Sequence, residues 1–164
     1  MGGRRGSRRR RPPTAPETRQ GQGARRPAPG CGGEAGAGAT AATEKDVTFN
    51  VLPLYHSTGG LVGVGPALLN GGTLVLRKRF SATSFWPDVK ASGATLFVYI
   101  GELCRYLVNS PEQPEERAHS LRLAFGNGLR PDVWPEFQRR FAIPEILEFY
   151  GSTEGNVSLF NFDG

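Results

Sequence analysis

The residues best suited to chemistry form one short stretch near the C-terminus, Tyr150-Gly151-Ser152-Thr153-Glu154-Gly155. An apolar run at 146–149 comes directly before it and predicts a buried strand. Serine and threonine hydroxyls hydrogen-bond phosphate oxygens, and a glutamate carboxylate binds a hard cation such as Mg²⁺. Because open α/β sheets bind ligands beyond the carboxyl ends of their strands, the stretch predicts a nucleotide phosphate site with its metal at Glu154. The alternative is a plain strand-ending turn with a solvated glutamate.

Two further loops follow predicted strands and offer small or polar groups to the same edge. Gly126-Asn127-Gly128 leaves the backbone bare, which suits a flat base or ribose, although an ordinary turn has the same sequence. His56 follows an earlier apolar run and is able to donate to a carboxylate or phosphate oxygen, or to be a plain strand-end histidine. Tyr150 is able to stack on a purine ring or to be a core aromatic. In a parallel sheet all three loops converge on one edge.

The elements that position these loops alternate between strands and helices along the chain, which predicts βαβ units and a doubly wound, mainly parallel sheet. Ser57 or Thr58 and Ser81 are candidate helix caps, and Pro66 predicts a kink or break. The predicted strands cover 47–54, 73–76, 95–100, 121–125, 146–149 and 157–160, and the predicted helices cover 60–69, 82–91, 101–109 and 131–141.

Residues 1–45 differ in composition from the rest of the chain, being rich in Arg, Gly, Ala and Pro with almost no large apolar residue. Such a segment buries too little surface to offset the entropy of ordering, so we expect a disordered tail. It has 10 Lys and Arg against 3 Asp and Glu, so its charge accounts for the basic balance of the whole 164-residue chain. No aromatic residue is interleaved with the arginines to stack on bases, which argues against a nucleic-acid partner.

Two cysteines, Cys31 and Cys104, make neither a metal-ligand pattern nor a disulfide framework, which favours a reducing, intracellular setting. No run of eighteen apolar residues predicts a transmembrane helix, and the basic N-terminus lacks the apolar core of a secretory signal.

Four motifs together resemble the fatty acid transport protein family of very-long-chain acyl-CoA synthetases, within the adenylate-forming, AMP-binding superfamily. The resemblance runs from about Asp46 to the C-terminus, and the tail takes no part in it. The motifs are Leu-Pro-Leu-Tyr-His-Ser at 52–57, Tyr-Ile-Gly-Glu-Leu-Cys-Arg-Tyr-Leu at 99–107, Gly-Asn-Gly-Leu-Arg at 126–130 and Glu-Phe-Tyr-Gly-Ser-Thr-Glu-Gly-Asn at 148–156.

The resemblance implies a long-chain or very-long-chain fatty acid–CoA ligase, coupled to fatty acid uptake, that uses ATP, Mg²⁺ and coenzyme A. By position, Tyr150 would stack on adenine, while Gly126, Asn127, Gly128, Gly151 and Ser152 would complete the nucleotide site. Thr153 would contact the α-phosphate, Glu154 would hold Mg²⁺, and His56 would lie near the acyl carboxylate. Association with the endoplasmic reticulum or plasma membrane is implied in the same way.

The family pattern also contains features that this sequence does not show. The lysine-bearing phosphate loop belongs upstream of the 52–57 motif, and the ribose-binding aspartate and catalytic lysine belong downstream of residue 164. We therefore expect residues 46–164 to form a partial AMP-binding domain, and the isolated chain to be inactive as a ligase. A non-catalytic fragment with partial nucleotide or lipid contacts, and an arginine-rich nucleic-acid binder carrying an inert domain, are the alternatives.

Overall fold

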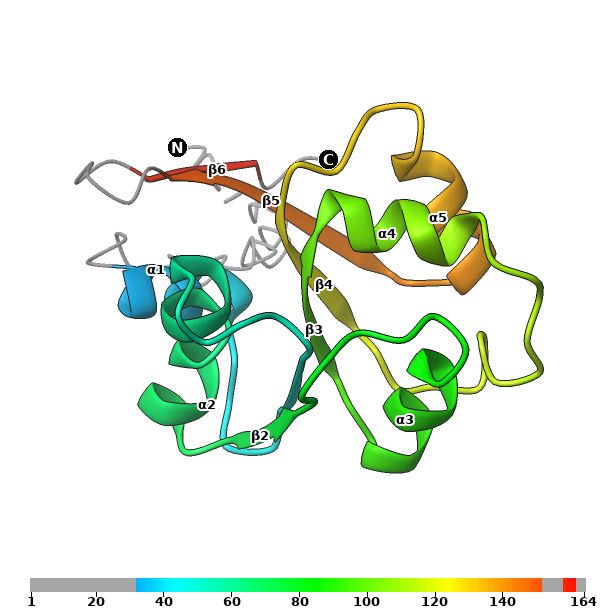
Figure 1. Cartoon of the computed structure of the whole chain (residues 1–164). Coiled ribbons are helices and arrows are strands. Elements are labelled where there is room, and N and C mark those ends of the chain that lie inside the picture. The colour runs from blue at the N-terminus through cyan, green and yellow to red at the C-terminus, as the bar shows by residue number, and fades with distance from the viewer. Residues whose placement is uncertain (1–31, 152–157, 162–164) are drawn as a thin grey trace, which may run out of the picture.

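A computed structural model describes residues 32–151 and 158–161, in which six strands form one sheet (Figure 1). The strands are β1 (Val47–Asn50), β2 (Thr73–Leu76), β3 (Leu96–Ile100), β4 (Leu123–Asn127), β5 (Glu145–Gly151) and β6 (Ser158–Asn161). Their order in the sheet is β2-β1-β3-β4-β5-β6. Neighbours from β2 to β5 are parallel, and β6 is antiparallel to β5. The predicted α/β fold with a mainly parallel, doubly wound sheet is confirmed.

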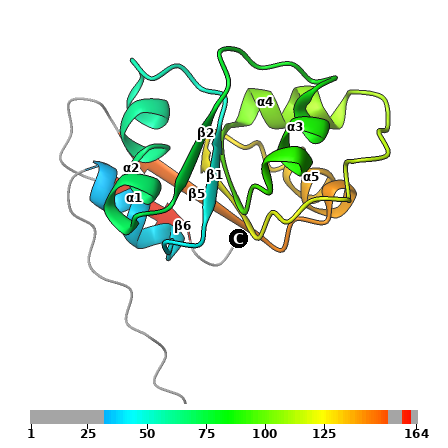
Figure 2. The ribbon, with the colours of Figure 1, turned by 90° about the horizontal axis from the view of Figure 1, so that it is seen from below.

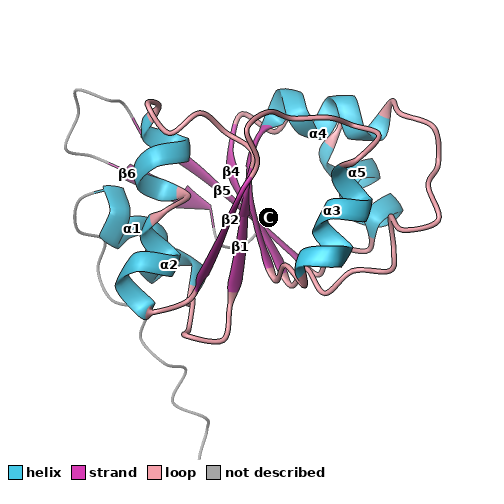
Figure 3. Ribbon diagram, turned by 60° about the horizontal axis from the view of Figure 1, so that its bottom comes forward, coloured by secondary structure: helices cyan, strands magenta, loops and turns pink. Residues whose placement is uncertain are grey.

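Helices cover both faces of the sheet, as the edge-on view in Figure 3 shows. The helical elements are α1 (Gly32–Thr40), a π-helical turn η1 (Thr58–Val62), α2 (Gly65–Asn70), α3 (Phe85–Ser92), α4 (Gly101–Val108) and α5 (Trp134–Phe141). α1 and α2 lie on one face, and α3, α4 and α5 lie on the other (Figures 2 and 3). The chain winds outward from β1 to β2, returns to β3 and continues to β5. Because parallel strands keep their carboxyl ends together, the loops after β1, β3 and β4 share one edge.

The core between the sheet and α3, α4 and α5 is aromatic. Phe85 and Trp86 of α3 are almost fully buried, and Phe97 of β3 meets the Phe85 ring edge-on at a centroid distance of 4.8 Å. Trp86 also packs on Phe141 of α5, with centroids 4.4 Å apart. Each such ring contributes roughly 1.5–3 kcal/mol through burial. This packing holds β3, α3 and α5 in fixed positions beneath the strand ends.

The strand after Asp46 ends earlier than expected, at Asn50 instead of residue 54. The Asn50 side chain accepts a hydrogen bond from the Leu52 amide and donates to the Gly59 carbonyl. These bonds fold the chain away from the sheet directly after β1. The predicted break at Pro66 is confirmed, since Pro66 lies in the first turn of α2, separate from η1.

Other boundaries differ from the expected ones by two or three residues. The third helix, α3, begins at Phe85 after a turn, and Ser81 does not cap it. β4 extends to Asn127 instead of ending at residue 125, so two residues expected in the following loop belong to the sheet. α5 begins at Trp134, with Pro135 in its first turn in place of Pro131.

Residues 32–40 form α1, which differs from the expectation of disorder throughout residues 1–45; residues 1–31 lie outside the described part. The small side chains allow close packing, since a Cβ atom on Gly36 would lie 2.9 Å from the Val62 carbonyl oxygen of η1. Arg122 fixes the end of the helix by donating to the Thr40 carbonyl and, at 2.8 Å, to the Asp46 carboxylate. Such close contacts stabilise an Ala- and Gly-rich helix, and composition alone does not reveal them.

Candidate functional site

The candidate site is a hollow at the carboxyl edge of the sheet, where β5 extends beyond its neighbour β4. The pairing of these two strands ends at Gly126 and Glu148, whereas β5 continues to Gly151 beside β6. A hollow of about 500 Å³ lies next to this extension, within the size range of small-ligand sites. It is lined by Asn127 and Gly128 after β4, by Glu148, Phe149, Tyr150 and Gly151 of β5, and by Leu159, Phe160 and Asn161 of β6.

Tyr150 lines this hollow and is 68% exposed, which excludes the alternative of a core aromatic. Its neighbour across the antiparallel pair is Leu159, which is also exposed. The ring is therefore available for stacking on a planar ligand. The sequence placed Tyr150 and Gly151 in a turn, but both belong to β5, because the pairing with β6 extends the strand to Gly151.

Asn127 and Gly128, after β4, also line the hollow. The Asn127 side-chain oxygen accepts a hydrogen bond of 3.2 Å from the Thr58 hydroxyl, which connects the loop after β1 with the end of β4. Gly128 is exposed and has a φ of 76°, a conformation that side chains rarely adopt. A Cβ atom on Gly101 would lie 1.7 Å from the Gly128 carbonyl oxygen, so the turn and the start of α4 are in direct backbone contact.

Gly126 does not leave a bare surface for a base, as the sequence suggested, because the Tyr99 side chain covers it. A Cβ atom on Gly126 would lie 2.7 Å from two carbons of the Tyr99 ring and 2.1 Å from the Tyr99 carbonyl oxygen. Tyr99, Gly126 and Glu148 occupy paired positions on β3, β4 and β5. The missing side chain at Gly126 lets the Tyr99 ring cross β4 and reach β5.

The Tyr99 hydroxyl donates a 2.5 Å hydrogen bond to the Glu148 carboxylate. The second carboxylate oxygen of Glu148 accepts from the Leu129 amide at 3.1 Å, directly after Gly128. Burial, together with the Glu148 charge, raises the pKa of Tyr99 far above its usual range, so its hydroxyl stays protonated as the donor. Burial and the same carboxylate raise the pKa of the Cys104 thiol, so this buried cysteine is not a thiolate nucleophile.

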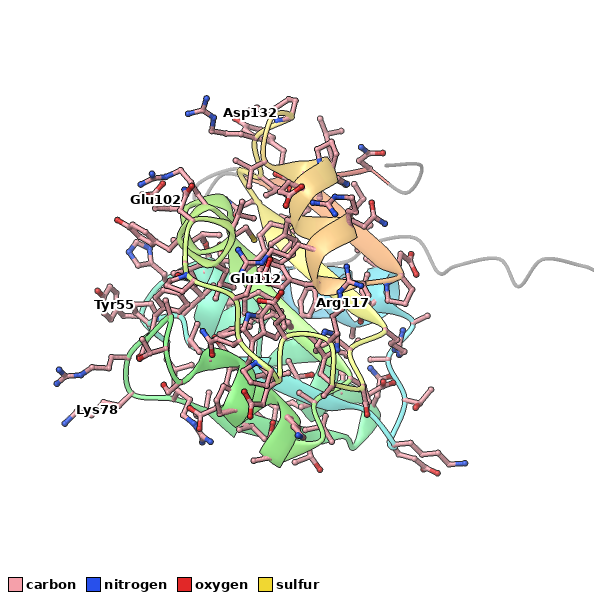
Figure 4. The ribbon with its side chains drawn as sticks, turned by 90° about the vertical axis from the view of Figure 1, so that its right-hand side faces the viewer. Tyr55, Lys78, Glu102, Glu112, Arg117 and Asp132 are labelled. Carbon is pink, nitrogen blue, oxygen red and sulfur yellow. The ribbon has the colours of Figure 1, made fainter. Side chains whose placement is uncertain are left out.

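His56 does not line the hollow. It is exposed, its ring is tilted against that of Tyr55 at a centroid distance of 5.0 Å, and its carbonyl accepts from the Gly60 amide. Tyr55 itself projects away from the ribbon into solvent (Figure 4). The loop of His56 reaches the hollow through Thr58, whose hydroxyl bonds Asn127.

Ser152, Thr153 and Glu154 lie outside the described residues, so the structure leaves their expected roles as proposals. Within the described residues there is no group of three or more His, Cys, Asp or Glu side chains that could hold a metal ion. Mg²⁺ is usually held by one or two carboxylates together with substrate phosphates, so a protein cluster is not required for the proposed site at Glu154. Among the described helices, none has the length and apolar character needed to cross a membrane.

A second hollow of about 510 Å³ lies between the loop after α4 and α5, and charged side chains line it. Glu112 and Arg117 mark this region in Figure 4. Arg140 is paired with Glu116, both side chains being nearly buried, and also donates to the carbonyl of Val108. Arg117 donates to two carbonyls at the end of α5. These two arginines hold the loop against α5, so the charged lining of this hollow is explained by contacts that stabilise the fold.

Asn127, Gly128 and Tyr150, which stand out in the sequence, line one hollow in the structure, whereas the hydrogen bond between Tyr99 and Glu148 is not expected from the sequence. In the sequence, Tyr99 and Glu148 stand out only as parts of motifs, and Thr58 only as a candidate helix cap. One signal was available for Glu148, because a carboxylate within the apolar run at 146–149 requires partners when it is half-buried.

Comparison with known proteins covers the candidate site and begins before Asp46, where the motifs placed the start of the resemblance. A sequence profile described as AMP-binding enzyme matches residues 32–163. Long-chain fatty acid transport protein 1 of Mus musculus is 53% identical over 119 residues, which are 73% of this chain and 18% of that protein. Long-chain fatty acid transport protein 5 of Homo sapiens is 54% identical over 123 residues, which are 75% of this chain and 18% of that protein. The chain thus spans about a fifth of the length of these curated relatives.

Solved structures agree with the fold. ATP-bound MatB from Rhodopseudomonas palustris superimposes with a TM-score of 0.66 at 28% identity, over 76% of this chain and 25% of that one. A benzoate CoA ligase from Burkholderia xenovorans LB400 gives a TM-score of 0.62 at 25% identity, over 70% of this chain and 24% of that one. The profile match over 32–163, the identity to fatty acid transport proteins and these superpositions together show that the chain belongs to the AMP-binding, adenylate-forming enzyme family.

Proposed function

We propose that this chain provides the adenine-binding part of the nucleotide site in a long-chain or very-long-chain fatty acid–CoA ligase. The observation that carries the proposal is the hollow between the Asn127-Gly128 turn and the exposed Tyr150 ring. A planar base inserted there would stack on Tyr150 while its edge faces the Asn127-Gly128 backbone. Stacking of a base on an aromatic side chain contributes roughly 1–3 kcal/mol.

The reaction proposed for the enzyme has two steps. A fatty carboxylate oxygen attacks the α-phosphorus of ATP, and pyrophosphate leaves with the electron pair of the broken bond. The coenzyme A thiolate then attacks the acyl carbon and displaces AMP. Catalysis of the first step depends mainly on positioning and on stabilising charge at the phosphate oxygens.

The other residues are assigned by their place in the chain relative to Tyr150. Gly151 and Ser152 would continue the site toward the phosphates, and Thr153 would donate to the α-phosphate. Glu154 would hold Mg²⁺, which would neutralise phosphate charge when bound. His56, in the loop that Thr58 ties to Asn127, would approach the acyl carboxylate.

Membrane association of the longer enzyme, at the endoplasmic reticulum or plasma membrane, is a further part of the proposal. Fatty acids partition into membranes, and the similar curated proteins are named as transport proteins.

The test replaces the matching segment of Mus musculus long-chain fatty acid transport protein 1 with residues 46–164 of this chain. The hybrid should form oleoyl-CoA from oleate, ATP and coenzyme A. Tyr150→Ala should raise the KM for ATP by roughly tenfold or more, as expected for the loss of one stacking contact. Tyr106→Ala, at another exposed tyrosine outside the hollow, is the matched control. Equal ATP dependence for the two variants would overturn the assignment of the adenine site.

A further inference from the structure

Three residues on adjacent strands form a continuous row beneath the candidate site. Tyr99 of β3, Gly126 of β4 and Glu148 of β5 are paired across the sheet, and the Tyr99 ring passes over Gly126. Tyr99 is fully buried, so its ring cannot move aside without disturbing the core. The row joins the middle of the sheet to the strand that carries Tyr150.

Glu148 connects this row to the turn that forms the wall of the hollow. One carboxylate oxygen accepts from the Tyr99 hydroxyl at 2.5 Å, and the other accepts from the Leu129 amide at 3.1 Å. Leu129 is buried and follows Gly128 directly, so its amide fixes where the exposed turn leaves the sheet. A carboxylate that accepts hydrogen bonds at both oxygens is held in one orientation.

We propose that Tyr99 and Glu148 are positioning residues, which hold the Asn127-Gly128 turn at the separation from Tyr150 that an adenine ring requires. Tyr99 orients the Glu148 carboxylate, and Glu148 anchors the turn through the Leu129 amide. This inference rests on the proposed function, because it assigns the hollow to the adenine base. Glu148 also lines the hollow, whereas Tyr99 does not, so Tyr99→Phe tests positioning without removing a group that could contact the nucleotide.

The alternative is that the row only stabilises the fold. The two cases differ at the Leu129 amide, because the other contacts of the turn, the Thr58–Asn127 hydrogen bond and the backbone contact of Gly128 with Gly101, do not replace its acceptor. If Leu129 loses its acceptor, the turn should open locally while the buried strands remain folded. A purely structural role would lower global stability without a selective change at the turn.

The first arm measures amide hydrogen exchange on the full 164-residue chain without nucleotide. Tyr99→Phe keeps the ring over Gly126 and removes only the hydroxyl. It should speed exchange of the Leu129 amide by about tenfold, and leave the β3 amides within about twofold of wild type. Tyr106→Phe, which removes a hydroxyl from an exposed tyrosine of α4, is the matched control and should change neither. Unchanged exchange at Leu129 in Tyr99→Phe would overturn the inference.

The second arm measures AMP binding to the same chain by calorimetry. Tyr99→Phe should weaken AMP binding about tenfold, and Glu148→Ala should weaken it further. Glu148→Gln should rescue much of the loss, since an amide can accept from Leu129 and donate to the Tyr99 oxygen. If the Glu148 carboxylate only stabilised the fold, the variants would not show this order of AMP affinities together with faster amide exchange at the turn.

The outcomes separate the two claims. Faster exchange with weaker AMP binding supports the positioning role. Faster exchange with unchanged AMP binding overturns the positioning role and leaves the adenine site intact. No binding of AMP by the wild-type chain at millimolar concentration would overturn the adenine assignment for this chain, and the positioning role with it, whatever the exchange rates show.

Discussion

Replacing Gly126 by alanine should destabilise the fold by about 3 kcal/mol, near the upper end of the usual cost of overpacking a core. The added methyl group would lie 2.1 Å from the Tyr99 carbonyl oxygen and 2.7 Å from its ring. An atom closer than 3.0 Å to an added Cβ atom has to shift, together with the group that it belongs to. The ring is fully buried and the carbonyl belongs to a strand between two parallel neighbours, so neither can move freely.

The assay is equilibrium unfolding in urea, followed by far-ultraviolet circular dichroism. A slope of about 1–3 kcal/mol per molar urea converts 3 kcal/mol into a midpoint lowered by roughly 1–3 M. Gly93→Ala is the matched control, because Gly93 has a φ of 64° but no atom within 4 Å of an added Cβ atom. Its cost should be about 1 kcal/mol, from backbone conformation alone. If Gly126→Ala unfolds at the same urea concentration as Gly93→Ala, the packing argument for the Tyr99 row is wrong.

Three further changes test other parts of the structure. Burial alone would raise the pKa of Asp46, but hydrogen bonds from Arg122, Thr95 and Thr43 outweigh it and lower that pKa below the usual range. The stabilising contribution of Asp46 should therefore be complete above the unfolded-state pKa of about 3.9 and decline at lower pH. Asp46→Asn should lower the free energy of unfolding by about 2 kcal/mol at pH 7 and by less at pH 3, as measured by urea unfolding at both pH values. Arg140→Ala should destabilise by about 3–5 kcal/mol, because it leaves the nearly buried Glu116 unpaired, and a loss below about 1 kcal/mol would contradict this. In the hybrid ligase, Glu154→Gln should reduce pyrophosphate release by roughly 10²-fold and raise the Mg²⁺ concentration that the reaction requires. If the rate of pyrophosphate release depends on Mg²⁺ in the same way in Glu154→Gln and wild type, Glu154 is only a solvated turn residue.

The sheet could be predicted because its strands are continuous apolar runs punctuated by glycine, proline and serine. β2 matches the expected 73–76 without change, and Pro66 separates η1 from α2 as expected. Strand ends were less predictable because they depend on distant partners. Asn50 ends β1 through its own side chain, and pairing with β6 carries β5 through Tyr150 to Gly151.

The residues of the candidate site also divide into those that local sequence predicts and those that depend on distant partners. Asn127, Gly128 and Tyr150 were identified from local sequence, and the structure brings them to one hollow. Gly126 could not be interpreted correctly, because its need for glycine comes from Tyr99, which is 27 positions earlier in the chain. Likewise, α1 is held by Arg122, a contact between distant residues that composition does not reveal.

The central claim, that an adenine base occupies the hollow beside Tyr150, is tested most directly by titrating AMP into the ¹⁵N-labelled chain and following backbone amide resonances. If adenine binds there, the amide resonances of Gly128, Leu129 and Tyr150 should shift saturably with AMP, and the shifts should be absent when Tyr150→Ala is titrated in the same way. Resonances that stay unchanged at these positions, or shifts gathered instead at the charged hollow around Arg117, would contradict it.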